Sequence, residues 1–431
     1  MHTPRRKLPM LVLAAGLACA ILAGVHAWMY RTPGARLAAG ETYPEMREDA
    51  SHHYIDLPVD HADLARGTLR GFYLLSPGFR KGGDVTFLLT DGQMELVDLD
   101  PDFDFFEAML GGASYVLIGV RGHAPTLLPE VYRDGKVDHA QAMRLYGSDQ
   151  QVGDIEAVRL DMLRKGLLPA DGRINVFGAS GAGVLAQQYV SAHGAHVRRL
   201  LLESTGAPDL SQRAGQAYSP DFANYNPMAA KALAPWLQAH PTARARVANV
   251  LYQQGRDAAD PRAAQLRTAR GLAGGRWLWT YELSPRRNLG MLAYVVRAPS
   301  SLMARVRWFE LVGADLVRYQ RNDRFNLLYE LSTVALDDML AWHRRHRIAP
   351  MRFQIDRRFS GDVLIIKGRQ DVVFDDASSE LLRAAYPHAR LLYVAGGHRL
   401  IGDEYRTVRL GFLQGGFAGA DAASLAYPAK P

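Results

Sequence analysis

The sequence predicts an α/β protein with one mostly parallel sheet, helices on both faces of the sheet and a large helical insertion. Strand-like and helix-like segments alternate from about residue 54 to 204, and this alternation is typical of parallel sheets. The alternation stops over residues 205–350, which are helix-like throughout, and resumes at about residue 361. Near the middle of the chain, a serine lies between a strand and a helix in a turn of small residues, as a chain that reverses within a few residues requires.

The first 28 residues form a separate unit. Basic residues precede an apolar run over residues 8–28, which is long enough for a signal-peptide core or a single membrane anchor. Because the basic flank should stay in the cytoplasm, we expect the chain after Trp28 to be exported, either secreted into the periplasm or anchored by this run. The only cysteine, Cys19, lies in the run, so the exported part has no disulfide.

The core elements follow one another in the order that strand-helix-strand units require. Expected strands cover residues 54–61, 68–75, 84–90, 113–120, 174–178, 197–203, 361–368 and 389–395. Expected helices cover residues 102–110, 148–166, 181–193 and 375–386, with a last helix after residue 402. The chain therefore divides into the N-terminal segment 1–28, a first core part 29–204, the insertion 205–350, a second core part 351–415 and an Ala-rich tail 416–431.

Composition and charge narrow the classes of function. With 431 residues, 48% of them hydrophobic, the chain can form a large core and a second substructure. The net charge of +7 arises from basic residues scattered among acidic ones, so we expect no nucleic-acid partner. No group of histidines or cysteines has the spacing of metal ligands, and we expect neither a metal nor an organic cofactor.

Three residues that follow strands indicate nucleophilic chemistry. Ser180 follows INVFGA, Asp371 follows VLIIKGRQ and His398 follows LLYVAGG. Hydrolases on such sheets carry their serine, acid and histidine in this chain order, at the edge where the parallel strands end. We therefore expect His398 to take the proton of Ser180 and Asp371 to orient the imidazole. Taken singly, each residue also fits an ordinary role in a turn or on the surface.

The glycines near Ser180 allow a second interpretation. Gly178, Gly181 and Gly183 form a G-x-x-G-x-G pattern, and Glu203 ends the next strand, where a dinucleotide-binding loop places the acid that binds the ribose. Such a loop normally opens the first strand-helix unit, whereas several expected strands precede this one. Dinucleotide binding is therefore the less favoured alternative.

On these residues the chain resembles the α/β-hydrolase superfamily, and within it the serine peptidases related to tripeptidyl and prolyl aminopeptidases. The resemblance covers residues 54–203 and 361–412 and includes IDLPVDHADLARGTL, LLTDGQ, VRGHAP, DIEAVR, GASGA, GRQD and GGH. It implies that the insertion is a cap that shapes the substrate pocket. It also implies an acid that binds the ammonium group of the substrate, and Glu203 is the candidate at the edge of the sheet.

The loop after the third expected strand departs from this family, because relatives carry HGGPG where this chain reads TDGQM over residues 90–94. Acyl transfer needs two donors aimed at the developing oxyanion. We expect the backbone N–H of Gly181 to supply one donor and that of Gly92 the other. Because of this unusual loop, we retain an alternative hypothesis, in which the protein is a catalytically inactive hydrolase fold that serves as a binding protein of the cell envelope.

The sequence therefore predicts an exported serine hydrolase that cleaves an ester or an amide, with aminopeptidase-like activity as one form, through an acyl-enzyme on Ser180. We expect a small molecule or a short peptide as its substrate. Contact with a membrane is expected only through the N-terminal segment.

Overall fold

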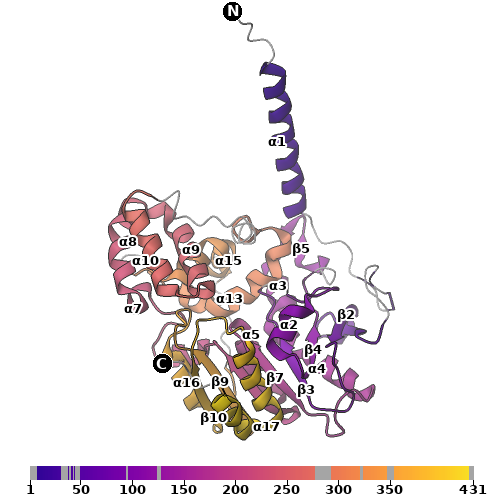
Figure 1. The fold of residues 1–431 in the computed structure, drawn as a ribbon. Helices are drawn as coiled ribbons and strands as arrows, with labels where there is room; N and C mark the ends of the chain where they lie inside the picture. The colour runs from indigo at the N-terminus through magenta and orange to yellow at the C-terminus, as the bar shows by residue number, and fades with distance from the viewer. Residues whose placement is uncertain are drawn as a thin grey trace, which may run out of the picture.

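A computed structural model describes residues 7–30, 37, 40–41, 43, 49–93, 96–123, 128–276, 293–320, 324–346 and 354–426. Its body is an eight-stranded sheet flanked by helices, with a cap of helices beside it and one long helix that projects away (Figure 1). The strand order is β1-β2-β4-β3-β7-β8-β9-β10. Only β2 runs antiparallel to its neighbours. The predicted fold class, a mostly parallel α/β-hydrolase sheet, is confirmed.

The ends of the strands lie within three residues of the ends that the sequence predicts. They are β1 (His52–Pro58), β2 (Thr68–Leu75), β3 (Val85–Leu89), β4 (Ser114–Ile118), β7 (Ile174–Ala179), β8 (Val197–Glu203), β9 (Asp362–Gly368) and β10 (Ala389–Val394). A short hairpin, β5 (Tyr132–Arg133) and β6 (Lys136–Val137), was not expected. The core helices are α2 (Phe103–Leu110), α3 (His139–Tyr146), α4 (Ser148–Arg164), α5 (Gly181–His193), α16 (Asp376–Ala385) and α17 (Asp403–Ala426).

The central strands are buried on both faces, which explains their continuous apolar runs. Val176 and Leu200 belong to one cluster of buried apolar side chains, which also contains residues of α4 and α5. The next residue on each strand, Phe177 or Leu201, belongs to a second cluster, which includes residues of α2 and α17. Because side chains alternate across a strand, each face of the sheet is covered by its own helices.

A buried ion pair ties the edge of the sheet to α4 and accounts for three motifs of the sequence. Arg121 donates to Asp154 Oδ2 through Nε over 2.6 Å and to the carbonyl of Val59 over 2.9 Å. His61 Nε2 lies 2.8 Å from Asp154 Oδ1. Burial raises the pKa of Asp154, but Arg121 and His61 outweigh this effect and hold it below its usual value. The VDH, VRG and DIEA motifs therefore meet in one structural network.

The cap contains α6 (Pro208–Arg213), α7 (Phe222–Tyr225), α8 (Pro227–Ala239), α9 (Arg244–Asp257), α10 (Pro261–Ala273), α13 (Leu302–Leu316), α14 (Leu327–Ala335) and α15 (Asp337–His346). Its first helices share an apolar cluster that includes Leu233 and Leu251. The helical character predicted for residues 205–350 is thus observed in the described part of this segment. Residues 277–292 and 347–353 lie outside the described residues.

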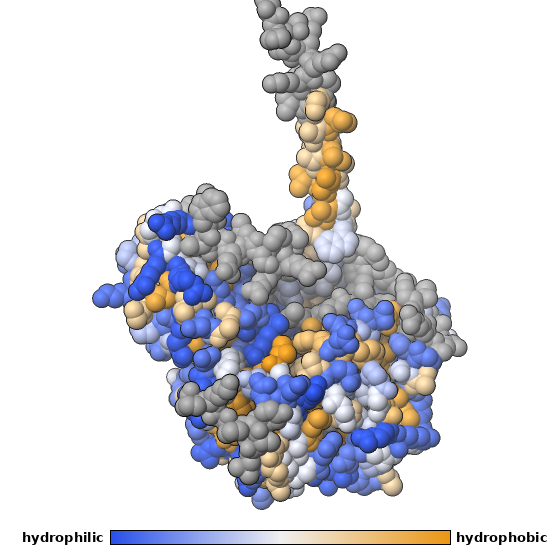
Figure 2. Space-filling view, in the orientation of Figure 1, coloured by the Kyte–Doolittle hydropathy of each residue, from blue (hydrophilic) through white to orange (hydrophobic). Residues whose placement is uncertain are grey.

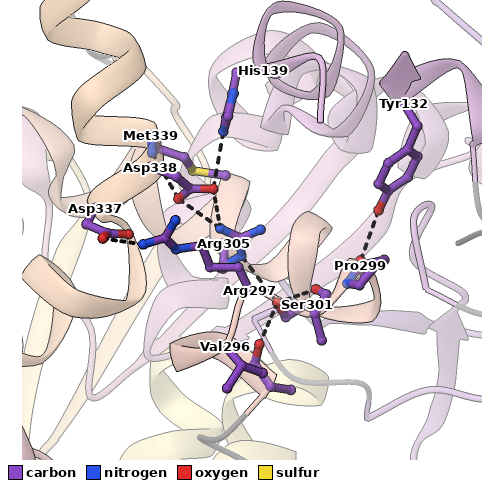
Figure 3. A network of polar contacts seen from close by, with 12 residues as sticks. Tyr132, His139, Val296, Arg297, Pro299, Ser301, Arg305, Asp337, Asp338 and Met339 are labelled. Carbon is purple, nitrogen blue, oxygen red and sulfur yellow. Dashed lines mark hydrogen bonds and ion pairs between the residues drawn. The ribbon is translucent and has the colours of Figure 1, made fainter. Parts of the chain in front are cut away.

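A polar network docks the later cap helices onto the core (Figure 3). Arg305 of α13 donates to both carboxylate oxygens of Asp338, over 2.9 and 2.8 Å, and His139 Nε2 of α3 lies 3.3 Å from the same carboxylate. Tyr132 of the hairpin donates to the carbonyl of Pro299 over 3.3 Å. Burial raises the pKa of Asp338, but the contacts with His139 and Arg305 prevail and hold it far below its usual value.

The two ends of the chain are helical. Helix α1 (Lys7–Met29) projects from the body as an apolar rod (Figure 2), and the window Val12–Met29 has a mean hydropathy of 1.9 with no part buried. By length and composition it suits a signal sequence or a membrane anchor. At the other end, α17 continues to Ala426 through a kink at Gly416. Much of the segment predicted as an Ala-rich tail therefore extends the last helix, and Ala420 is buried.

We expect Arg121→Met to lower the free energy of unfolding by about 3–5 kcal/mol, because it leaves the buried carboxylate of Asp154 without its main partner. Urea unfolding monitored by circular dichroism would measure the change. The control is Arg383→Met, which removes an exposed ion pair with Glu380 and should change stability by less than about 1 kcal/mol. Equal effects of the two substitutions would contradict a structural role for the network.

We expect the stabilisation by Asp338 to depend on pH. A carboxyl with a depressed pKa in the folded state contributes stability above the pKa of the unfolded chain, and this contribution is lost as the pH falls through the folded pKa. The free-energy difference between the wild type and Asp338→Asn should therefore be largest above about pH 5 and shrink towards about pH 3. The neighbouring Asp337→Asn, in an exposed pair with Arg297, is the control, and a difference for Asp338→Asn that does not change with pH would refute the prediction.

Candidate active site

Ser180 occupies a strained turn between β7 and α5. Its backbone has φ 53° and ψ −126°, which non-glycine residues rarely adopt. The Ser180 N–H donates to the carbonyl of Glu203 over 2.9 Å, and the Ser180 carbonyl accepts from Thr205 Oγ1 over 2.6 Å. These contacts with the neighbouring strand and the residue that follows it hold the turn, which presents the serine side chain at the carboxyl edge of the sheet, as in a nucleophile elbow.

Ser180, His398 and Asp371 form one chain of polar contacts. His398 Nε2 lies 3.1 Å from Ser180 Oγ, and His398 Nδ1 lies 3.2 Å from each carboxylate oxygen of Asp371. Ser180 follows β7, Asp371 follows β9 and His398 follows β10. The structure thus brings together the three residues that the sequence predicts, in the order that a serine nucleophile, its base and an orienting acid require.

The surroundings of Asp371 favour its charged form. Its Oδ1 accepts from the backbone N–H of Val373 over 2.8 Å, and Lys367 Nζ lies 3.7 Å from its Oδ2. Burial raises the pKa of Asp371, but His398, Lys367 and the Val373 amide together outweigh burial and hold it below its usual value. A charged Asp371 fixes the tautomer of His398, with the proton on Nδ1 and the lone pair of Nε2 towards the serine.

A cavity of about 520 Å³ opens beside Ser180 and His398, between core and cap. Its lining is mostly apolar and comes from both parts of the chain. Apolar and aromatic lining residues are Leu88, Leu89, Leu96, Phe105, Phe106, Met109, Tyr252, Tyr294, Trp308, Leu328, Leu331, Leu400 and Ile401. Polar lining residues other than Ser180 and His398 include Asp91, Gln93, Glu203, Arg256 and Arg399. The cavity suits an apolar group attached to a reacting carbonyl.

Glu203 lies at the cavity, as expected from its place at the end of β8, but its carboxylate is already engaged. Arg409 of α17 donates to Oε2 through Nε over 2.8 Å and to Oε1 through Nη2 over 2.9 Å. Both side chains are buried. The role of Glu203 in binding an ammonium group stays a prediction, and this pairing does not favour it.

The unusual loop after β3 lies directly against the elbow. A Cβ atom on Gly181 would collide with the side chains of Asp91 and Gln93. Gly92 has φ 76°, its carbonyl accepts from His123 Nε2 over 2.9 Å, and it is absent from the described lining of the cavity. The assignment of Gly92 as the second oxyanion donor therefore stays a prediction. Its neighbours in the chain, Asp91 and Gln93, do line the cavity.

Other protein atoms occupy the space that side chains at the elbow glycines would need. A Cβ atom on Gly178 would collide with the carbonyl of Ala182, and one on Gly183 would meet the side chain of Thr205. These glycines thus permit close approach of α5 to the neighbouring strands. Together with the pairing of Glu203, this packing argues against the dinucleotide alternative.

One group of possible metal ligands occurs among the described residues, with one member on α4, one at the end of α5 and one in the turn after α5. Glu156, His193 and His196 place their ligand atoms within 4.8 Å of one another. However, Arg159 donates to both carboxylate oxygens of Glu156, over 2.8 and 2.6 Å, and Tyr189 donates to one of them. A guanidinium so close opposes a metal cation, so the group does not alter the expectation that the protein needs no metal.

Sequence reasoning missed the contribution of the cap to the loop after β3. Tyr294 donates to the backbone carbonyl of Gln93, and Arg307 Nε lies 3.9 Å from Asp91 Oδ2. Met303 packs against Gly92 so closely that a side chain there would clash. The only available signal was the departure of TDGQM from the pattern of the family, since the contacts of a helical insertion cannot be read from its periodicity.

No family model matches the chain, and no curated protein matches it by sequence. Solved structures of similar shape include an esterase from Exiguobacterium antarcticum, with 16% identity over 80% of this chain and 96% of that chain and a TM-score of 0.40. A 2-hydroxy-6-oxo-6-phenylhexa-2,4-dienoate hydrolase from Rhodococcus sp. strain RHA1 has 15% identity over 88% of this chain and 100% of that chain, with a TM-score of 0.36. An enol-lactonase from Burkholderia xenovorans LB400 has 13% identity over 76% of this chain and 89% of that chain, with a TM-score of 0.35. The assignment of the site therefore rests on its own geometry.

Proposed function

We propose that the protein is a serine hydrolase that cleaves an ester or an amide through an acyl-enzyme on Ser180. The observation that carries this proposal is the unbroken chain of contacts from Ser180 through His398 to Asp371 on a strained elbow. An elbow of this kind stores backbone strain that a purely structural serine would not need. The cavity beside the serine provides room for the substrate.

The geometry supports the following mechanism. His398 Nε2 takes the proton of Ser180 Oγ as the oxygen attacks the carbonyl carbon, and Asp371 stabilises the imidazolium that forms. The N–H of Gly181 donates to the oxyanion of the tetrahedral intermediate. His398 then gives its proton to the leaving group. In the second half of the reaction, water attacks the acyl carbon while His398 takes a proton from it, and the return of this proton to Ser180 Oγ releases the acid.

The lining of the cavity supports an apolar acyl group more than a charged amino terminus. The apolar side chains that surround Ser180 would bind a hydrocarbon or aromatic group, while the carboxylate of Glu203 is held by Arg409. A small-molecule ester is accordingly our first candidate substrate, and a short peptide is the second. Two of the solved structures above are named as an esterase and an enol-lactonase, and both names denote enzymes that act on ester bonds.

We further propose that the protein is exported and that it contacts a membrane only through α1. The apolar side chains of this helix are exposed along its length, which fits insertion into a translocation channel or a bilayer. The body carries no second helix of this character among the described residues.

Labelling with a fluorophosphonate probe tests the proposed function on the full-length protein in detergent. We expect labelling of the wild type, none for Ser180→Ala, and strongly reduced labelling for His398→Ala, because the serine then lacks its base. Asp371→Asn should lower kcat on an ester by about 10⁴-fold, because the histidine tautomer is no longer fixed. Ser360→Ala, at an exposed serine, is the control, and a folded wild type that resists labelling would favour the inactive binding protein.

Export is tested with alkaline phosphatase fused to the C-terminus and expressed in a Gram-negative host. The fusion should be active outside the cytoplasm, and the double variant Leu17→Arg/Ile21→Arg should abolish this activity, because each charge at the centre of an apolar segment costs about 2.5–3.5 kcal/mol. Leu64→Arg, at an exposed position of the body, should leave export intact. Full phosphatase activity in the double variant would disprove the assignment of α1.

A further inference from the structure

The structure points to the side-chain amide of Gln93 as the second donor to the oxyanion, in place of a backbone amide of the loop. This inference rests on the proposed function. Gln93 lines the cavity together with Ser180 and Gly181, and its Nε2 lies so close to Gly181 that a Cβ atom there would collide with it. The N–H of Gly181 is the first donor, so the amide of Gln93 lies next to the position where the oxyanion forms.

The orientation of the amide follows from its contact with Asp91. Gln93 Nε2 lies 2.6 Å from Asp91 Oδ2, and a carboxylate can only accept hydrogen bonds, so the nitrogen and not the oxygen of the amide faces Asp91. An NH₂ group has two hydrogens about 120° apart, of which Asp91 takes one. No described residue accepts the second hydrogen of Gln93, and it is available to a ligand in the cavity.

The backbone groups of Gln93 are committed elsewhere, so its side-chain amide is the part of this residue that can donate into the cavity. The backbone N–H of Gln93 donates to Asp91 Oδ1 over 3.1 Å, and its carbonyl accepts from Tyr294. Asp91 therefore holds Gln93 at two points, and the cap holds it at a third. A fixed donor needs no reorganisation when charge develops on the substrate, which is the condition for strong stabilisation.

The charge of Asp91 does not cancel this effect, because a buried cation lies behind it. Arg307 of α13 is fully buried, and its Nε lies 3.9 Å from Asp91 Oδ2. Arg307 also donates to Glu310 Oε2 over 3.1 Å, and burial raises the pKa of Glu310, which favours its neutral form. Arg307 therefore offsets part of the charge of Asp91, whereas the N–H of Gln93 presents a dipole to the cavity. Asp91 is thus a positioning residue for Gln93.

The test compares Gln93→Met, which keeps the length of the side chain but removes the donor, with the wild type on p-nitrophenyl butyrate. Removal of one oxyanion donor should lower kcat by about 10²- to 10³-fold and leave KM within about threefold. Affinity for butylboronic acid, which forms a tetrahedral adduct on serine, should fall with kcat. Gln238→Met carries the same substitution on an exposed face of α8 and should behave as the wild type.

Gln93→Leu provides a second test if the methionine variant does not fold, since its shorter apolar side chain also lacks a donor and brings no second carboxyl against Asp91. A melting temperature within a few degrees of the wild type would separate loss of the donor from loss of structure. Wild-type kcat in a folded Gln93→Met or Gln93→Leu variant would overturn the assignment of Gln93 while leaving the serine hydrolase intact. Absence of both labelling and turnover in the wild type would instead overturn the proposed function, and the assignment with it.

Discussion

The tight turn at Ser180 is the constraint on which the rest of the site depends. A serine with φ 53° can persist only where the surrounding structure compensates for the strain. Here β8 supplies that support through the carbonyl of Glu203, and Thr205 binds the serine carbonyl. This turn also fixes where α5 begins. Because α5 then lies close to the strands, Gly178 and Gly183 have no room for a side chain. The position of Ser180 and the packing of α5 on the central sheet therefore depend on the same close contacts.

Three buried carboxylates at or next to the cavity each have a basic partner that is not among the residues lining it. The pairs are Asp91 with Arg307, Glu203 with Arg409, and Asp371 with Lys367. A carboxylate removed from water without such a partner would be protonated or would destabilise the fold. Because the charges are matched within the protein, the cavity combines an apolar wall with a few fixed dipoles. This environment strengthens each hydrogen bond made to a developing oxyanion.

The sequence predicted the elements of the core well, because the central strands are buried on both faces and their apolar runs are continuous. It also predicted that Ser180, Asp371 and His398 lie close together, since residues that directly follow parallel strands meet at one edge whatever the details of packing. The sequence did not reveal that Glu203 is paired, because Arg409 lies on the last helix, over two hundred residues away. Roles within the loop after β3 were equally hidden, since they depend on side-chain contacts with the cap.

The cap contacts the loop after β3 as well as shaping the cavity, and α13 makes several of these contacts. Met303 on this helix packs against Gly92, while Arg307 backs Asp91. Two residues away from each, about half a turn around the helix, Arg305 binds Asp338 and ties the same helix to α15 and, through His139, to the core. Because α13 is buried along most of its length, it cannot shift to suit one contact without disturbing the others. In the proposed mechanism, the helix that holds the loop after β3 is therefore the same helix that docks the cap, so substrate binding under the cap and stabilisation of the intermediate would both depend on α13.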